Sequence, residues 1–269
     1  MSRRTRKSSS KEVATWDEEL AKQAEVAASM EAVAGGGQFF STKGGQLSWQ
    51  DAPLPDNEMA VVILDHIFET VYYEGRYDPD TPQSPTAFAF GRDQDELRWH
   101  ENSDPEFAGE LCADSEVCEW GSADTGKGKA ARETRRLAMI PAGQFNRNGE
   151  FELFDEPDHY ATTTVGFMKL PVTSVKGFAN FVKQVAGALK RPPFGIIARV
   201  AVVPDAKTQF KVTFEVIDKV PDELMGAIMQ RREEVMEIID FPYQRDDEEA
   251  EPAPKRGAKK PARRSRRKY

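Results

Sequence analysis

Apolar residues along the chain form short runs that are typical of strands. The longest run, MAVVILDHIFETVYYEGRY at 59–77, is rich in β-branched and aromatic residues, as a long buried strand requires. The segments 86–91, 135–143 and 161–172 show the same character. QFFSTKGGQLSWQ predicts two short strands around a turn that contains Lys43, Gly44 and Gly45.

Alternating residues predict a hairpin, and apolar residues at helical spacing predict three helices. FGIIARVAVVPDAKTQFKVTFEVID alternates on both sides of a turn at 204–207, which indicates two antiparallel strands. An alanine-rich helix is expected at 12–34, ended by three glycines. A second helix follows Ser174, its expected cap, and a third, amphipathic helix is expected within 221–239.

This pattern predicts an α+β fold centred on β-strands, with an OB-like small barrel and peripheral helices. We expect three regions: a basic arm, helix and glycine hinge at 1–37, a core at 38–243, and a tail at 244–269. Regular periodicity is lost at 93–128, which predicts a long loop insertion that is functional or mobile. The charged ends are too polar to fold alone and are expected to be disordered.

Charge is distributed unevenly along the 269 residues. The formal net charge is −8, but residues 1–11 carry five cations and residues 255–269 carry nine, in both cases without an acid. The remaining 23 cations and all 45 acids lie between these ends, a balance of −22. An acidic body repels nucleic acid, so binding to DNA would require cations gathered on one surface.

The sequence predicts an intracellular protein. It has no apolar run of the ~18 to 20 residues that a membrane span needs, and its first residues lack the apolar segment of a signal peptide. Two cysteines, Cys112 and Cys118, provide no disulfide framework and suit a reducing compartment.

The stretch CEWGSADTGKGKAARETRR at 118–136 resembles a nucleotide-binding motif in part. Gly121 to Lys127 fits the first positions of G-x-x-x-x-G-K, but Gly128 stands where Ser or Thr would hold Mg²⁺. The preceding residues are also an acidic loop where the motif needs a hydrophobic strand. The sequence therefore does not predict a nucleotide hydrolase.

Metal and catalytic signals are weak. Cys112 and Cys118 are separated by five residues, more than in a typical zinc knuckle, and His100 lies twelve residues before Cys112. We therefore predict no metal and no other cofactor, with these three residues as the weak alternative. No catalytic triad or acidic pair stands out, and Asp65 and His66 lie in an apolar strand, so no enzyme is predicted.

The same stretch has the residue types of a grip on single-stranded nucleic acid. Glycines permit close approach of a phosphate chain, cations neutralise it, and aromatic rings stack on bases. The alternative reading is a solvated basic loop paired with the acidic insertion beside it. A second group, Lys169, Lys176, Lys183, Lys190 and Arg191, could extend the surface. The predicted contacts are Lys127, Lys129, Arg132, Arg135 and Arg136 for phosphates, and Tyr72, Tyr73 and Trp120 for bases.

The segment RRTRKSSSKEVATWDEELAKQ resembles the amino-terminal arm of T-even-type phage single-stranded DNA-binding proteins. In that family a basic cluster with Ser or Thr precedes an alanine-rich helix and mediates cooperative contacts along DNA. The resemblance assigns this role to Arg3, Arg4, Arg6 and Lys7.

The body resembles a family of tailed-phage and prophage proteins over most of residues 38–243. The resemblance rests on FSTKGGQLSW, VVILDHIFETVYYEGRYDPDTPQSPTAFAFG, EWGSADTGKGKAARETRRLAMI, KLPVTSVKGFANFVKQVA and RPPFGIIARVAVVPDAKTQFKV. Relatives carry a C-x-x-C before EWGS and a cysteine after GKGKA. At the corresponding positions this chain has Cys112, Ser115 and Ala131. The resemblance therefore implies that any zinc site of the relatives has been lost or that this chain binds metal differently.

The resemblance implies non-specific, cooperative single-stranded DNA binding in phage replication or recombination, in the host cytoplasm, without catalysis or a membrane. The acidic segment DDEEAE would recruit replication or recombination proteins. Two alternatives remain open: an acidic interaction or regulatory factor that mimics DNA or binds a host enzyme, and a virion or DNA-packaging protein.

Overall fold

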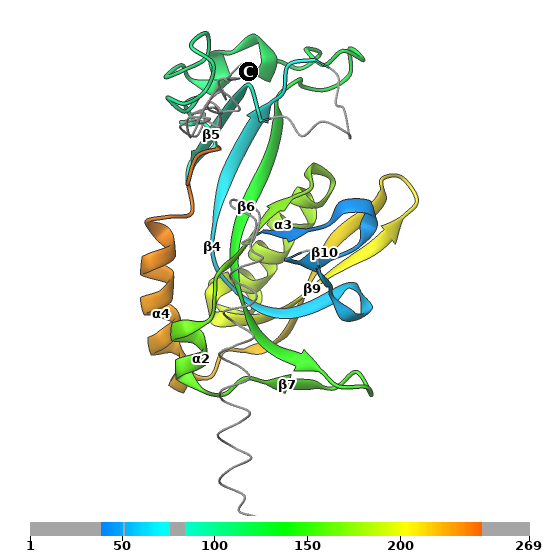
Figure 1. Cartoon of the computed structure of the whole chain (residues 1–269), viewed down its shortest axis with the longest axis vertical. Helices are drawn as coiled ribbons and strands as arrows, with labels where there is room; N and C mark the ends of the chain where they lie inside the picture. The colour runs from blue at the N-terminus through cyan, green and yellow to red at the C-terminus, as the bar shows by residue number, and fades with distance from the viewer. Residues whose placement is uncertain (1–38, 51, 76–83, 244–269) are drawn as a thin grey trace, which may run out of the picture. The chain divides into compact units, whose positions relative to one another are not determined.

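The computed structural model describes residues 39–50, 52–75 and 84–243, which form two compact units (Figure 1). The first unit contains the described residues up to Glu69 together with Glu133–Asp240. The second contains those of Thr70–Arg132 together with 241–243.

A seven-stranded sheet provides the framework, with the order β10-β9-β4-β6-β7; β5 pairs with β4 and β8 pairs with β6. Its longest strands are β4 (Glu58–Tyr72) and β6 (Arg132–Phe145), which run side by side in Figure 1. Antiparallel pairing joins β9 to β4 and β10, and β6 to β7 and β8. The other strands are β5 (Ala87–Gly91), β7 (Phe151–Leu153), β8 (Gly166–Leu170), β9 (Ile196–Asp205) and β10 (Gln209–Lys219).

The apolar runs of the sequence bury their side chains as predicted. Within β4, all residues from Ala60 to Asp65 are buried, because both faces of this strand are covered. Val61, Leu137, Ala198 and Phe178 belong to one hydrophobic core that joins the sheet to the helix behind it. The predicted hairpin is confirmed as β9 and β10, which pair from Asp205 and Gln209 onward.

A small three-stranded sheet and several short turns precede β4. Its order is β1-β2-β3, with antiparallel pairing throughout. The elements are β1 (Phe40–Ser41), a 3-10 turn η1 (Lys43–Gly45), β2 (Ser48–Trp49), β3 (Ala52–Pro53) and a second turn η2 (Pro55–Asn57). The predicted pair of strands around Lys43–Gly45 is therefore confirmed, with one further short strand.

Three helices pack in the first unit: α2 (Pro157–Thr162), α3 (Val172–Gln184) and α4 (Asp222–Met236). A π-helical segment η5 (Val185–Leu189) extends α3, and a 3-10 turn η6 (Pro193–Gly195) precedes β9. Two predictions need correction. Helix α2 occupies the start of the strand expected at 161–172, and α3 begins after Pro171, so Ser174 lies inside it. The Ser174 hydroxyl instead accepts the amide of Val212 at 2.8 Å.

The second unit consists mostly of irregular segments that are joined by backbone hydrogen bonds. Phe88 of β5 accepts the amide of His100 at 2.7 Å, and Leu97 accepts that of Cys112 at 2.8 Å. Trp99 is 1% exposed, and its ring lies 5.7 Å from that of Phe107 between centroids; Phe88 and Leu97 are buried as well. Two 3-10 turns follow, η3 (Cys112–Asp114) and η4 (Glu116–Cys118).

The mixed, strand-dominated α+β architecture is therefore confirmed. Among the described strands the pairings form an open path with two branches, and no closed barrel is found. Within the described part of the chain, no helix is long and apolar enough to cross a membrane. The helix expected at 12–34, the basic arm and the tail at 244–269 lie outside the described residues.

Candidate nucleic-acid interface

The glycine-rich loop of the second unit, residues 119–131, is closed by hydrogen bonds between its two sides. The amide of Gly121 donates to the carbonyl of Gly128 at 2.7 Å, and that of Ala131 donates to Val117 at 2.8 Å. The Ser122 hydroxyl lies 2.7 Å from the carbonyl of Glu119 and accepts the amide of Ala130 at 2.9 Å. This internal bonding gives the loop a defined shape although it contains no strand or helix.

The loop does not form a phosphate cradle of the nucleotide-binding type. In such a cradle the backbone amides point at the phosphate. Here the amides of Gly121 and Ala123 both point at the carbonyl of Gly128, and that of Gly126 donates to Ala123 at 2.6 Å. Gly128 has a φ of 100°, a conformation that L side chains rarely adopt, so glycine is required by this internal turn.

Trp120 is the most prominent side chain of the loop. It is 82% exposed, which is unusual for the largest apolar side chain. The bond from Gly121 to Gly128 brings its backbone beside the segment that carries Lys127 and Lys129, both of which are exposed. Arg132 at the start of β6 is exposed as well. The structure thus brings one predicted stacking residue and two predicted phosphate contacts together on one loop.

The two predicted tyrosines are less accessible. Tyr72 and Tyr73 are half-buried at the end of β4. The Tyr72 ring lies 5.5 Å from that of Phe107, and burial, followed by the charge of Glu74, raises the pKa of its hydroxyl. Tyr72 therefore belongs partly to the packing of the second unit, and its proposed role in stacking stays a prediction.

The last two predicted cations, Arg135 and Arg136, belong to the first unit. Arg136 is 1% exposed; its Nε lies 3.1 Å from Glu69 Oε2 and its Nη1 donates to the carbonyl of Ile239 at 3.2 Å. The expectation that Arg136 contacts DNA is therefore corrected: it is an internal structural cation. Arg135 is half-buried with its guanidinium 3.8 Å from the Phe68 ring centroid, and burial lowers its pKa.

Acids outnumber cations around the loop. The described residues of the second unit contain twelve Asp and Glu but five Lys and Arg. Glu116, Glu119 and Asp124 lie within or next to the loop itself. A nucleic acid would therefore meet attraction only at close range, near the exposed cations, and repulsion from the rest of this unit.

A separate group of lysines lies on the first unit. From His159 to Pro204 the chain contains no acid and six cations. Lys176 and Lys183 stand two turns apart on α3, both exposed, and Lys190 follows the π-helical segment. Lys169 and Arg191 are already engaged with Glu69 and Asp222, at 3.4 and 3.5 Å.

The weak metal alternative is not assembled. Among the described residues, no cluster of three or more His, Cys, Asp or Glu side chains is placed to hold a metal ion. Cys112 is buried, Cys118 is half-buried, and neither forms a disulfide. His100 stacks on Phe88 with ring centroids 4.9 Å apart, while its Nδ1 accepts the amide of Asn102 at 3.0 Å.

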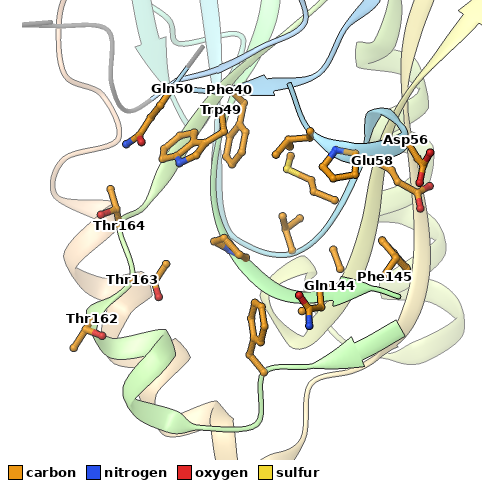
Figure 2. A pocket seen from close by; sticks show the side chains of 18 residues that line it. Phe40, Trp49, Gln50, Asp56, Glu58, Gln144, Phe145, Thr162, Thr163 and Thr164 are labelled. Carbon is orange, nitrogen blue, oxygen red and sulfur yellow. The ribbon is translucent and has the colours of Figure 1, made fainter. Parts of the chain in front are cut away.

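A pocket in the first unit was not predicted from the sequence (Figure 2). Its volume is about 730 Å³, within the usual range for binding pockets. Four aromatic side chains line it, from segments far apart in the chain. They are Phe40, Trp49, Phe145 and Phe154. Two carboxylates, Asp56 and Glu58, also line it, and Figure 2 shows them away from the Phe40–Trp49 pair.

Comparisons with protein-family models, curated proteins and solved structures found no match to this chain. The resemblance to phage proteins therefore stays a prediction.

Proposed function

We propose that the protein binds single-stranded DNA without sequence preference, through the loop that contains Trp120, Lys127 and Lys129. The observation that carries the proposal is the 82% exposure of Trp120 on a hydrogen-bonded loop that also presents two exposed lysines. An exposed flat ring and two cations on one loop match the needs of a base and its neighbouring phosphates. Stacking one base on such a ring contributes about 1–3 kcal/mol.

In this proposal Lys127, Lys129 and Arg132 neutralise phosphates, and release of the condensed counterions drives binding. Lys176, Lys183 and Lys190, from the stretch 159–204 that contains no acid, add a second, independent contact on the first unit. The basic arm supports cooperativity, and the acidic tail segment recruits replication or recombination proteins. An OB-like arrangement of the strands forms part of the same proposal, and no catalytic step is assigned to the protein.

The experiment is a titration of fluorescent oligo(dT) with the full chain at about 0.1 M ionic strength, where the Debye length is about 10 Å. Lys127→Glu with Lys129→Glu is expected to reduce affinity by at least about tenfold, because two contacts become repulsive. The matched control reverses two other exposed cations on turns, Arg147→Glu with Lys207→Glu, and is expected to change affinity only slightly at moderate ionic strength. Equal losses in the two variants would remove the loop from the interface.

A second candidate function is favoured by the acidity of the second unit. Twelve acids against five cations suit a protein that presents a DNA-like surface to a basic partner. Replacing Glu116, Glu119 and Asp124 by their amides distinguishes the two. Under the first proposal this variant should bind DNA more tightly. Under the second it should associate more weakly with a protein partner, in a complex that survives nuclease treatment.

A further inference from the structure

The pocket of the first unit has an aromatic wall that is built by close packing. The rings of Phe40 and Trp49 lie 4.4 Å apart between centroids and rest on Gly166 of β8. A Cβ at Gly166 would clash with the Phe40 ring and lie 2.8 Å from Trp49. The absence of a side chain at this position therefore allows both rings to lie against the strand and form one wall of the pocket.

The charge of the pocket is negative. Among the described residues that line it, Asp56 and Glu58 are the charged ones, and none is a lysine or arginine. Arg199 lies beside the pocket, 3.8 Å from Glu58, with its guanidinium 4.5 Å from the Phe145 ring centroid. Arg199 therefore already pairs with Glu58 and covers Phe145. A phosphodiester meets no cation among the described lining residues, whereas a further cationic side chain gains from Asp56 and from the aromatic wall.

The rim of the pocket stores backbone strain. Gln50 and Asp56 line the pocket with φ of 50° and 52°, and Asn57 follows with 57°. These are three of the five non-glycine residues with positive φ in the described chain. Asn57 holds the conformation, since its side chain accepts the amide of Leu47 at 3.1 Å and donates to Gly45 at 3.2 Å. Strain of this kind is concentrated at binding sites, because the structure must hold a particular surface in place.

We infer that this pocket binds the basic carboxy-terminal segment of the protein, residues 255–269, from the same or a neighbouring copy. The segment KRGAKKPARRSRRKY carries nine cations, five of them arginines, and no acid. It is the most cationic part of the chain, and guanidinium groups pair with carboxylates and stack on aromatic faces. The same contact already occurs in the structure between Arg199 and Phe145 and between Arg232 and Phe194. Binding there holds these cations away from nucleic acid.

The test uses the full chain with a photo-cross-linking amino acid at Gln50, which is exposed at the rim. The control position is Gln184, exposed at the end of α3. Mass spectrometry of the irradiated protein is expected to find cross-links from position 50 to residues 255–269 at a yield at least five times that from position 184. Mixing isotopically light and heavy chains then reports whether the segment comes from the same or a neighbouring copy.

A charge test checks whether the carboxylates of the pocket hold the segment. Asp56→Asn with Glu58→Gln, in the chain labelled at position 50, is expected to reduce the cross-link yield at least fivefold. Asn tolerates the left-handed conformation of position 56. The control, Glu223→Gln with Glu233→Gln, neutralises two exposed acids of α4 and should leave the yield unchanged. Cross-links to residues 1–38, equal yields from both positions, or equal losses in both variants would overturn the inference. These readouts contain no DNA and are independent of the proposed nucleic-acid function.

Discussion

Arg136 provides a test that separates its structural role from the predicted DNA contact. Arg136→Met removes the cation that pairs with Glu69, whose side chain is fully buried. In this variant the Glu69 carboxylate keeps its second salt bridge, to Lys169, whose Nζ lies 3.4 Å from Oε1 and whose side chain is 32% exposed. Removing one partner of a buried ion pair costs about 3–5 kcal/mol, since the other charge loses its compensation. The carbonyl of Ile239 also loses a donor, worth about 1 kcal/mol.

The double variant Glu69→Leu with Arg136→Met removes both charges. Replacing a buried ion pair by apolar residues is often neutral or stabilising, so the double variant is expected to be more stable than either single variant by at least about 2 kcal/mol. Urea unfolding followed by circular dichroism measures these free energies, and oligo(dT) titration measures DNA affinity. A single Arg136→Met variant that keeps its stability but loses DNA affinity would refute the reasoning.

Three further predictions follow from individual contacts. Gly166→Ala should destabilise the protein by about 1–3 kcal/mol, because the new Cβ would clash with Phe40 and Trp49. Gly177→Ala on α3 introduces a Cβ with nothing within 4 Å and should stabilise the protein by up to about 1 kcal/mol. Urea unfolding measures both changes. Lys190 has a φ of 54°, so Lys190→Gly should retain or raise thermal stability by relieving strain, while it weakens oligo(dT) binding. Burial, assisted by Asp155, raises the pKa of Tyr160 to about 12. Folding therefore favours the neutral hydroxyl, and its contribution to the free energy of unfolding is complete below about pH 10 and is lost between about pH 10 and 12. The variant Tyr160→Phe lacks this ionisation, so its free energy of unfolding should fall less than that of the wild type across the same interval.

The strands could be predicted from sequence because burial on both faces leaves a continuous apolar run. This holds for β4, and the alternation around 204–207 likewise identified β9 and β10. The open path of strands could not be predicted, because strand order depends on pairings between distant segments. Helix α2 was missed because it is only six residues long.

The exposure of a side chain at the candidate site could be predicted where it follows from the local sequence. It could not be predicted where a distant residue of the chain buries the side chain. Trp120 and Lys127 lie in a segment without periodicity, which signals a surface loop. Arg136 looked equivalent to Arg132, but it begins the continuous buried run of β6, and its partner Glu69 stands within an apolar strand. One charged residue of opposite sign in each of two apolar strands is a sequence pattern that indicates a buried ion pair. The pocket had no comparable signal, because Trp49 and Phe145 come from distant segments and line one pocket only in the folded chain.

The most direct test of the proposed function is the affinity of the full chain for single-stranded oligo(dT) as a function of salt, compared with a duplex of equal length. The six cations assigned to phosphates predict a slope of log affinity against log salt of about −4, at about −0.7 per contact on a single strand. The account predicts this slope together with tighter binding to the single strand than to the duplex. A flat salt dependence, or equal affinity for both DNA forms, would contradict it.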